Sequence, residues 1–296
     1  MNEENDEAPK ELFAEVFGCP VANTNKEVLG TRIKGYCRFI DGPCQKSTYE
    51  DARGVRRSMG VCSLYHHGAN IAITCPHRLK ENNHIFKAAS KFCFPGVKEN
   101  EIVLMPEMRL PTSRGRAGNI DYILIHQKKG KVVDFSGLEL QTVYFSGDSI
   151  KKGFVEYMEK QHLGIAVSPK QTGRQHPDYR SSSKKRLLPQ LIEKCPVFSK
   201  WQKKFCVAIH SEFYSELLKG VSFDVICEEE ADFAWIVMDY TKKSDFSLQL
   251  EVKEIVYSKS EAILKAFLIS PEDILPLDTF ITTLEMKLAV LVTKRR

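Results

Sequence analysis

Residues 104–147 constrain the fold of this chain more than any other stretch. Two apolar runs, 120–126 and 131–145, flank the polar segment Gln127-Lys128-Lys129-Gly130. Runs of this length on either side of a short turn that ends in glycine predict an antiparallel β-hairpin. The sequence therefore places a long two-stranded ribbon at the centre of the fold.

Pairing within this hairpin brings acidic residues together. If the turn centres near Lys129, Asp121 lies roughly opposite Gly137, and Glu139 and then Gln141 follow on one face in steps of about 6–7 Å. Gly137 removes a side chain where the strands meet, so Asp121 and Glu139 can close on one ion. Two carboxylates beside a polar group suit Mg²⁺, which predicts metal-assisted phosphodiester hydrolysis. A plain hairpin with solvated acids is the alternative.

Length and composition limit the class of protein. The 296 residues are enough for one large core or two modest domains, and 43% hydrophobic with 27% charged residues excludes a mostly disordered chain. No apolar run reaches the length of a membrane span, and the acidic N-terminus lacks the apolar core of a signal peptide. Nine cysteines without an export signal predict a reducing cytoplasm, where clustered thiols more often bind metal than form disulfides.

Six of the nine cysteines lie within residues 18–93. Runs 61–65 and 71–75 predict a second hairpin, whose pairing brings two thiols together, and the loop YCRFIDGPC carries another close pair. Two such pairs make a tetrahedral sulfur site that suits zinc or a single iron. A set of small buried thiols is the alternative, and Cys19 competes for a ligand place. The proposed ligands are Cys37, Cys44, Cys62 and Cys75.

Basic residues concentrate in one later segment. Residues 170–204 hold ten lysines and arginines against two acids, and hydroxyl groups lie among them. This mixture is typical of surfaces that contact phosphates and base edges, although a solvated loop would have the same composition. An exposed, Pro/Gly/Ser-rich loop before Asp121 adds further arginines. The candidate DNA-binding residues are Arg114, Arg116, Arg174, Arg180, Ser182, Lys184, Lys185 and Arg186.

The rest of the chain predicts a mixed α/β core with helices on the faces of the sheet. Strands are expected over 203–210, 231–240 and 246–258, and helices over 10–17, 86–94, 149–162, 211–220, 260–268 and 278–291. The last helix places Phe280, Ile281, Leu284, Leu288 and Leu291 on one face. Core packing is the more common explanation of such a face, and a dimer surface is the alternative.

The acidic pattern D-x17-E-x-Q resembles the PD-(D/E)XK nuclease core in its ExQ variant. The runs GNIDYIL, VVDFSGLELQTVYFSG and HPDYRSSSKKRLLPQLI, together with the four cysteines, resemble the NotI-like type II restriction endonucleases over about residues 11–220. This resemblance implies a restriction-endonuclease-like α/β fold with a mixed sheet. The chain is then expected to divide into an N-terminal tail and short helix (1–17), a four-cysteine metal-binding segment (18–93) and a nuclease core with DNA-recognition elements (94–296).

The same resemblance assigns roles. Asp121 and Glu139 would bind the catalytic Mg²⁺, Gln141 would position water or metal, and Glu107, fourteen residues before Asp121, would be an additional acid. The four cysteines would hold a structural iron, with zinc still open on thiolate chemistry. The expected enzyme is a bacterial, cytoplasmic homodimer that cleaves double-stranded DNA at a palindromic, GC-rich site. A loosely specific repair or mobile-element nuclease and a non-catalytic DNA-binding module are the alternatives.

Overall fold

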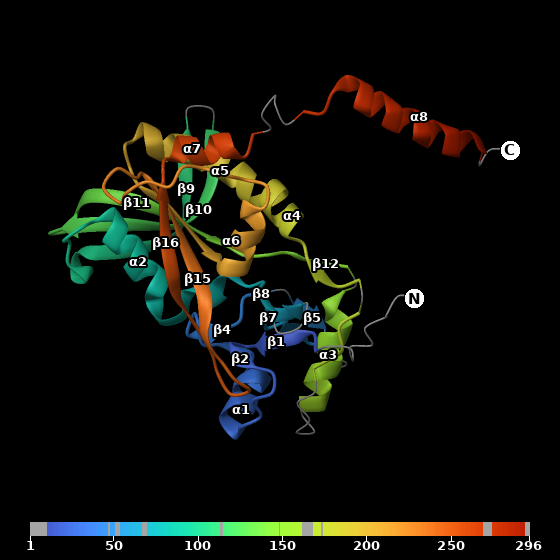
Figure 1. The fold of residues 1–296 in the computed structure, drawn as a ribbon. Helices are drawn as coiled ribbons and strands as arrows, with labels where there is room; N and C mark the ends of the chain where they lie inside the picture. Colours follow the sequence, from blue (N-terminus) through green and yellow to red (C-terminus); the bar gives the residue numbers. More distant parts are fainter. Residues whose placement is uncertain are drawn as a thin grey trace.

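A computed structural model gives the architecture of the chain (Figure 1). It describes residues 11–46, 48–50, 54–66, 70–112, 115–147, 149–161, 168–172, 174–268 and 274–293.

A six-stranded mixed sheet forms the centre of the molecule, in the order β16-β15-β14-β11-β10-β9. Strands β11, β14 and β15 run parallel, and the remaining pairs are antiparallel. The predicted mixed α/β core is therefore confirmed. The strands are β9 (Ile102–Thr112), β10 (Gly115–Lys128), β11 (Lys131–Gln141), β14 (Phe205–His210), β15 (Phe233–Lys243) and β16 (Leu248–Ser258).

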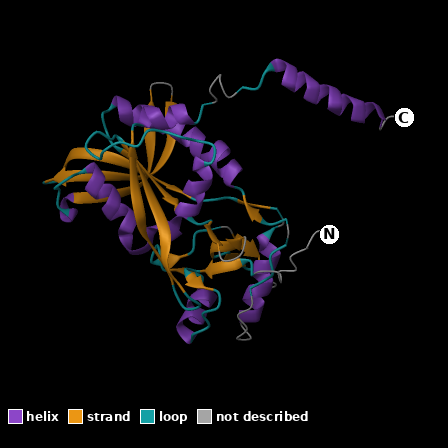
Figure 2. Cartoon of the chain, in the orientation of Figure 1, coloured by secondary structure: helices purple, strands orange, loops and turns teal. Residues whose placement is uncertain are grey.

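Helices cover both faces of this sheet (Figure 2). On one face, η1 (Pro76–Asn83) and α2 (His84–Cys93) pack in a core with Cys206 and Ala208 of β14. On the other face, α5 (Leu188–Lys200), α6 (Ser211–Leu218) and α7 (Ser260–Ala266) pack against Phe205, Val207 and Ile209 of the same strand. Alternate residues of β14 thus serve opposite cores, as a strand buried on both faces requires.

A second, four-stranded antiparallel sheet lies in the N-terminal part, in the order β2-β1-β7-β8. It consists of β1 (Phe13–Val16), β2 (Cys19–Pro20), β7 (Val61–His66) and β8 (Asn70–Ile73). The helix predicted over 10–17 is wrong, because β1 is a strand with all four residues buried. Pairing with β7 buries both faces of this segment, which favours a strand over an amphipathic helix.

Smaller elements complete the chain. They are α1 (Lys26–Lys34), β3 (Tyr36–Cys37), β4 (Gly42–Pro43), β5 (Thr48–Glu50), β6 (Arg56–Ser58), η2 (Glu99–Glu101), β12 (Phe145–Ser146), α3 (Ile150–Gln161), β13 (His176–Pro177), α4 (Tyr179–Ser182), the π-helical turn η3 (Ser183–Leu187) and α8 (Leu277–Thr293).

Most other predicted elements are confirmed. The helices predicted over 86–94, 149–162 and 211–220 correspond to α2, α3 and α6, and the second hairpin corresponds to β7 and β8. The loop expected before Asp121 is wrong, because the end of β9 and the start of β10 occupy most of it and pair Arg109 with Asn119. Residues 179–200 form a nearly continuous helical segment that the sequence analysis did not predict.

The C-terminal helix α8 extends away from the body of the molecule (Figure 1). Phe280, Ile281, Leu284 and Leu288 are 58%, 41%, 49% and 61% exposed, so the expected core packing of this face is wrong for these side chains. Within the described residues, no helix is long and apolar enough to cross a membrane.

Candidate active site

The central hairpin has the predicted position but a different register. Its turn is Lys129-Gly130, both with positive φ (+50° and +74°), as a tight two-residue hairpin turn requires. A bulge between His126 and Gln127 shifts the pairing, so that Ile123 lies opposite Gly137. The predicted pairing of Asp121 with Gly137 is therefore wrong.

The corrected register brings Asp121 directly beside Glu139. Tyr122 pairs with Leu138. Because the strands are antiparallel, Asp121, one residue before Tyr122, faces Glu139, one residue after Leu138. The backbone N–H of Leu140 donates to Asp121 Oδ2 at 2.8 Å, and the N–H of Asp121 lies 3.4 Å from Glu139 Oε1. These hydrogen bonds fix the two carboxyl groups next to each other in the sheet.

Gly137 makes room for apolar side chains, and not, as predicted, for the two acids to close on an ion. A Cβ at this position would lie 2.5 Å from Cζ of Phe198 and 2.6 Å from Cδ1 of Ile120. Glycine thus lets the aromatic side chain of Phe198, on α5, approach the sheet closely. This close approach brings the buried face of α5 against β10 and β11.

A lysine on that face of α5 completes the acidic pair. Lys194 is 2% exposed, and its Nζ donates to Glu139 Oε1 at 2.5 Å. Burial raises the pKa of Glu139, the charge of Asp121 raises it further, and Lys194 opposes both, which leaves the pKa of Glu139 at about 8. Sequence reasoning missed Lys194. Its spacing from Leu191 and Phe198, three and four residues away on an apolar helix face, was the available signal.

Gln141 and Glu107 occupy different environments. Gln141 is 5% exposed, at the end of β11, and its Nε2 donates to the carbonyl oxygen of Thr142 at 3.1 Å. Glu107 is exposed on the edge strand β9, where the pairing of Ile120 with Met108 places it level with Asp121. Its φ of +52° is an uncommon backbone conformation for a non-glycine residue.

The donor chemistry at Asp121 and Glu139 suits a hard divalent cation. Both are carboxylates held side by side, and with both ionised their charge exceeds that of Lys194 by one unit. Lys194 itself places a positive charge beside the Glu139 carboxyl group. Among the described residues, however, no group of three or more His, Cys, Asp or Glu side chains is gathered closely enough to hold a metal. Glu107 therefore does not close a three-acid site in this structure.

The four predicted cysteine ligands are all buried in the N-terminal part of the molecule. The hairpin brings Cys62 and Cys75 together, since the N–H of Cys75 lies 3.2 Å from the carbonyl oxygen of Cys62. Lys46, two residues after Cys44, donates to the carbonyl oxygens of Val61 and Thr74 at 2.7 and 3.1 Å. The loop that carries Cys37 and Cys44 is thereby tied to the hairpin that carries the second pair.

The electrostatics of these thiols reflect the same arrangement. Burial raises the pKa of Cys37, Cys44 and Cys62, and the charge of Cys75 raises the pKa of each one further. For the competitor Cys19, burial raises the pKa and the charges of Arg38 and Arg32 lower it. Backbone N–H groups donate to the sulfur atoms of Cys37, Cys44 and Cys62, which suits thiolates bound to a soft metal. The four thiols nevertheless form no gathered metal-binding group among the described residues.

The candidate DNA-binding residues divide into three groups. Arg174, Arg180, Lys184, Lys185 and Arg186 are exposed. Ser182 is fully buried, and its hydroxyl accepts a hydrogen bond from the N–H of Tyr144 at 2.8 Å, so the structure gives it an internal role. Arg114 lies outside the described residues, as does the side chain of Arg116.

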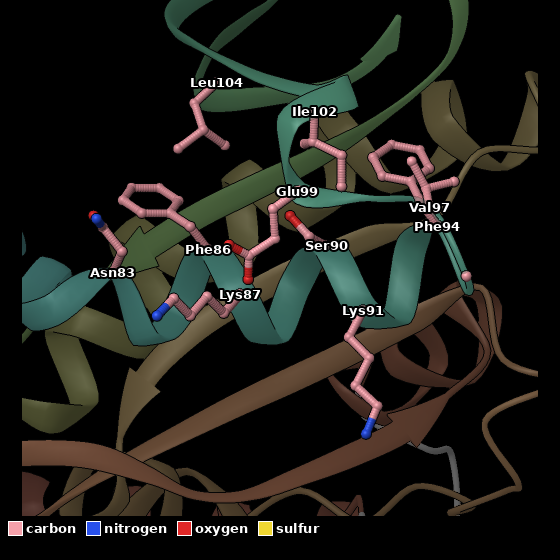
Figure 3. A pocket seen from close by; sticks show the side chains of 11 residues that line it. Asn83, Phe86, Lys87, Ser90, Lys91, Phe94, Val97, Glu99, Ile102 and Leu104 are labelled. Atoms are coloured by element: carbon pink, nitrogen blue, oxygen red, sulfur yellow. The ribbon is translucent and has the colours of Figure 1, made fainter.

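Two cavities have neither Asp121 nor Glu139 among their lining residues. A hollow of about 1010 Å³ has Arg180 and Lys184 among its lining residues, which places it beside the exposed basic surface. A smaller cavity of about 330 Å³ lies between α2, which supplies Phe86 and Ser90, and β9, which supplies Ile102 and Leu104 (Figure 3). None of the residues lining this smaller cavity is one of the candidate catalytic acids.

Comparison with known proteins agrees with the resemblance seen in the sequence. A family model described as restriction endonuclease NotI matches residues 12–249. This range covers most of the chain and includes the cysteine-rich part, the central hairpin and the exposed basic residues. The search of curated proteins finds no match. On the extent of the family match, the chain belongs to the restriction endonuclease NotI family, a family of type II restriction endonucleases.

Proposed function

We propose that this protein hydrolyses phosphodiester bonds in double-stranded DNA, with Mg²⁺ bound by Asp121 and Glu139, at a specific palindromic, GC-rich site. The observation that carries the proposal is the pair of adjacent carboxyl groups on β10 and β11, fixed by backbone hydrogen bonds. Family membership supports the substrate and the reaction class. The site pattern is the ExQ variant of the PD-(D/E)XK arrangement, with Gln141 two residues after Glu139.

Each residue has a defined part in this mechanism. A bound Mg²⁺ would activate water and stabilise the charge that develops on the phosphate. Asp121 and Glu139 would hold the cation, and the N–H of Leu140 orients the Asp121 carboxylate. Gln141 would position water through its amide, which carries no charge, and Glu107, on the edge strand, would be an additional acid. The exposed residues Arg174, Arg180, Lys184, Lys185 and Arg186 contact the DNA backbone.

A digest of a large, sequenced DNA tests this function directly. The purified protein is expected to give discrete fragments with Mg²⁺ and none with EDTA, and Glu139→Ala is expected to remove the fragments. Mapped ends carrying a 5′-phosphate and a 3′-hydroxyl would then reveal the recognition sequence. A Mg²⁺-dependent smear would indicate a loosely specific nuclease instead. Intact DNA together with a mobility shift in EDTA would indicate a non-catalytic binding module.

We also propose that Cys37, Cys44, Cys62 and Cys75 bind one structural metal ion, iron or zinc. Support comes from their burial, from the hydrogen bonds that tie the two pairs together, and from the effect of Cys75 on the other three thiols. A tetrahedral thiolate site would rigidify the irregular loop between β3 and β5. Metal analysis of the purified protein would identify the ion.

The active form is proposed to be a homodimer, because a two-fold symmetric protein matches a palindromic site. Helix α8 offers a contact surface for a second copy. Residues 277, 281, 284, 288 and 291 are apolar and alternate in steps of four and three, the spacing of paired helices. Its acidic first turn, with Asp278, and the basic residues that follow the helix favour an antiparallel pair.

The double substitution Leu284→Glu with Leu288→Glu is expected to convert the dimer into a monomer. Both side chains are about half or more exposed within one copy, so the change would disturb the pair and leave the fold of each copy intact. Sedimentation velocity at several protein concentrations would measure the oligomeric state. Thr282→Glu, placed off the apolar row, serves as the control. A double variant that remains dimeric would show that α8 is not the contact surface.

A further inference from the structure

In the ExQ pattern, a neutral glutamine stands where the wider PD-(D/E)XK pattern has a positively charged lysine. An amide such as Gln141 carries no positive charge, and in this structure its Nε2 donates one hydrogen bond to the carbonyl oxygen of the next residue, Thr142. Phosphodiester hydrolysis develops negative charge, which fixed cations stabilise in a site shielded from water. A positive side chain from another element would therefore complete the group.

Lys194 meets this requirement by position. Its Nζ lies 2.5 Å from Oε1 of Glu139, and both side chains are 3% exposed. The helix that carries it is held in place by Leu191, Cys195 and Phe198, all fully buried. The ammonium group therefore has little freedom to move away from the acidic pair.

The burial of Lys194 on an apolar helix face is difficult to explain by a purely structural role. Burying an ammonium group costs free energy, and buried ion pairs are seldom more stabilising than well-packed apolar side chains. An apolar residue at position 194 would continue the buried face of α5 beside Leu191 and Phe198. A lysine at this point fits a requirement of the site better than a requirement of the core.

We propose that Lys194 supplies the positive charge that Gln141 cannot, and that it acts as a positioning residue through Glu139. It holds the Glu139 carboxylate in the orientation used for the cation and adds a fixed charge beside the reacting phosphate. The proposal rests on the Mg²⁺-dependent nuclease function stated above. It places the cationic partner of the acids on a helix 55 residues beyond Glu139.

Single-turnover cleavage at saturating Mg²⁺ tests the role. Lys194→Met is expected to lower the maximal rate at least about 100-fold, and Lys194→Arg to recover at least tenfold of that loss. DNA binding measured with Ca²⁺ in place of Mg²⁺ is expected to stay within threefold of wild type. This binding measurement separates a lost charge from a damaged fold. Lys160→Met removes the matched but exposed pair of Lys160 with Glu156, 2.7 Å apart, and is expected to leave both measurements unchanged.

A maximal rate within threefold of wild type for Lys194→Met would overturn the proposal, even if less Mg²⁺ were then needed. That result would show that Lys194 pairs with Glu139 only when no cation is bound, and that Mg²⁺ displaces its ammonium group. If the methionine variant does not fold, Lys194→Gln gives the same comparison, because it keeps a donor for Glu139 without the charge. If the wild-type protein itself does not cleave DNA with Mg²⁺, the proposed function fails, and the role of Lys194 fails with it.

Discussion

Asp121→Asn is expected to lower DNA cleavage at least about 1000-fold while leaving the fold intact, because a lost cation ligand removes several kcal/mol of transition-state stabilisation. The substitution preserves shape, since an asparagine oxygen can still accept the hydrogen bond that Leu140 donates to Asp121 Oδ2 at 2.8 Å. Single-turnover cleavage of a DNA fragment that carries the mapped site measures the effect.

The same variant has an expected effect of opposite sign on DNA binding without metal. The Asp121 carboxylate repels phosphate when no cation is bound, so Asp121→Asn should tighten DNA binding in EDTA about fivefold, or about 1 kcal/mol. Asp134→Asn is the matched control: Asp134 also accepts from a backbone N–H, that of Phe135, but pairs with Lys203 away from the acids. Equal changes in both variants would show that net charge alone acts, and cleavage retained by Asp121→Asn would remove Asp121 from the site.

Local sequence patterns predicted the parts of the site that depend on neighbouring residues. The hairpin of β10 and β11 follows from two apolar runs and the turn Lys129-Gly130, and the approach of Cys62 and Cys75 follows from the second hairpin. The register of the first hairpin could not be read, because the bulge between His126 and Gln127 has no clear sequence signal. That one-residue irregularity decides which residue faces Asp121.

Long-range contacts account for what the sequence did not predict. Lys194 reaches Glu139 only because Gly137 admits Phe198 close to the sheet, a packing relation between distant segments. The helical segment 179–200 was missed because a basic run and two prolines, Pro189 and Pro196, are typical of a loop. Pro189 lies just after the π-helical turn η3, at the start of α5, and Pro196 lies within α5.

A buried ionic network joins the N-terminal four-stranded sheet to the central six-stranded sheet. Arg78 is fully buried. Its Nε lies 2.9 Å from both carboxyl oxygens of Glu15, and its two terminal nitrogens donate to Glu81 and to the carbonyl oxygen of Leu248, at 2.8 and 2.9 Å. Burial alone would lower the pKa of Arg78, but the charges of Glu15, Tyr240 and Glu81 raise it above its ordinary value. The guanidinium therefore stays charged and connects β1, η1 and β16.

Arg78→Met is expected to destabilise the protein by about 3–5 kcal/mol, because it leaves the buried carboxylates of Glu15 and Glu81 without their partner. Thermal unfolding followed by circular dichroism should show a midpoint lowered by roughly 10 °C. Arg38→Met is the control, since Arg38 pairs with the same Glu81 at 2.8 Å but is 48% exposed, so its loss should cost less than about 1 kcal/mol. Adding Glu15→Gln to Arg78→Met should recover part of the stability by removing one unpaired charge. If Arg78→Met unfolded at the same temperature as Arg38→Met, the two sheets would be held together by their shared apolar core, and the network would serve another purpose.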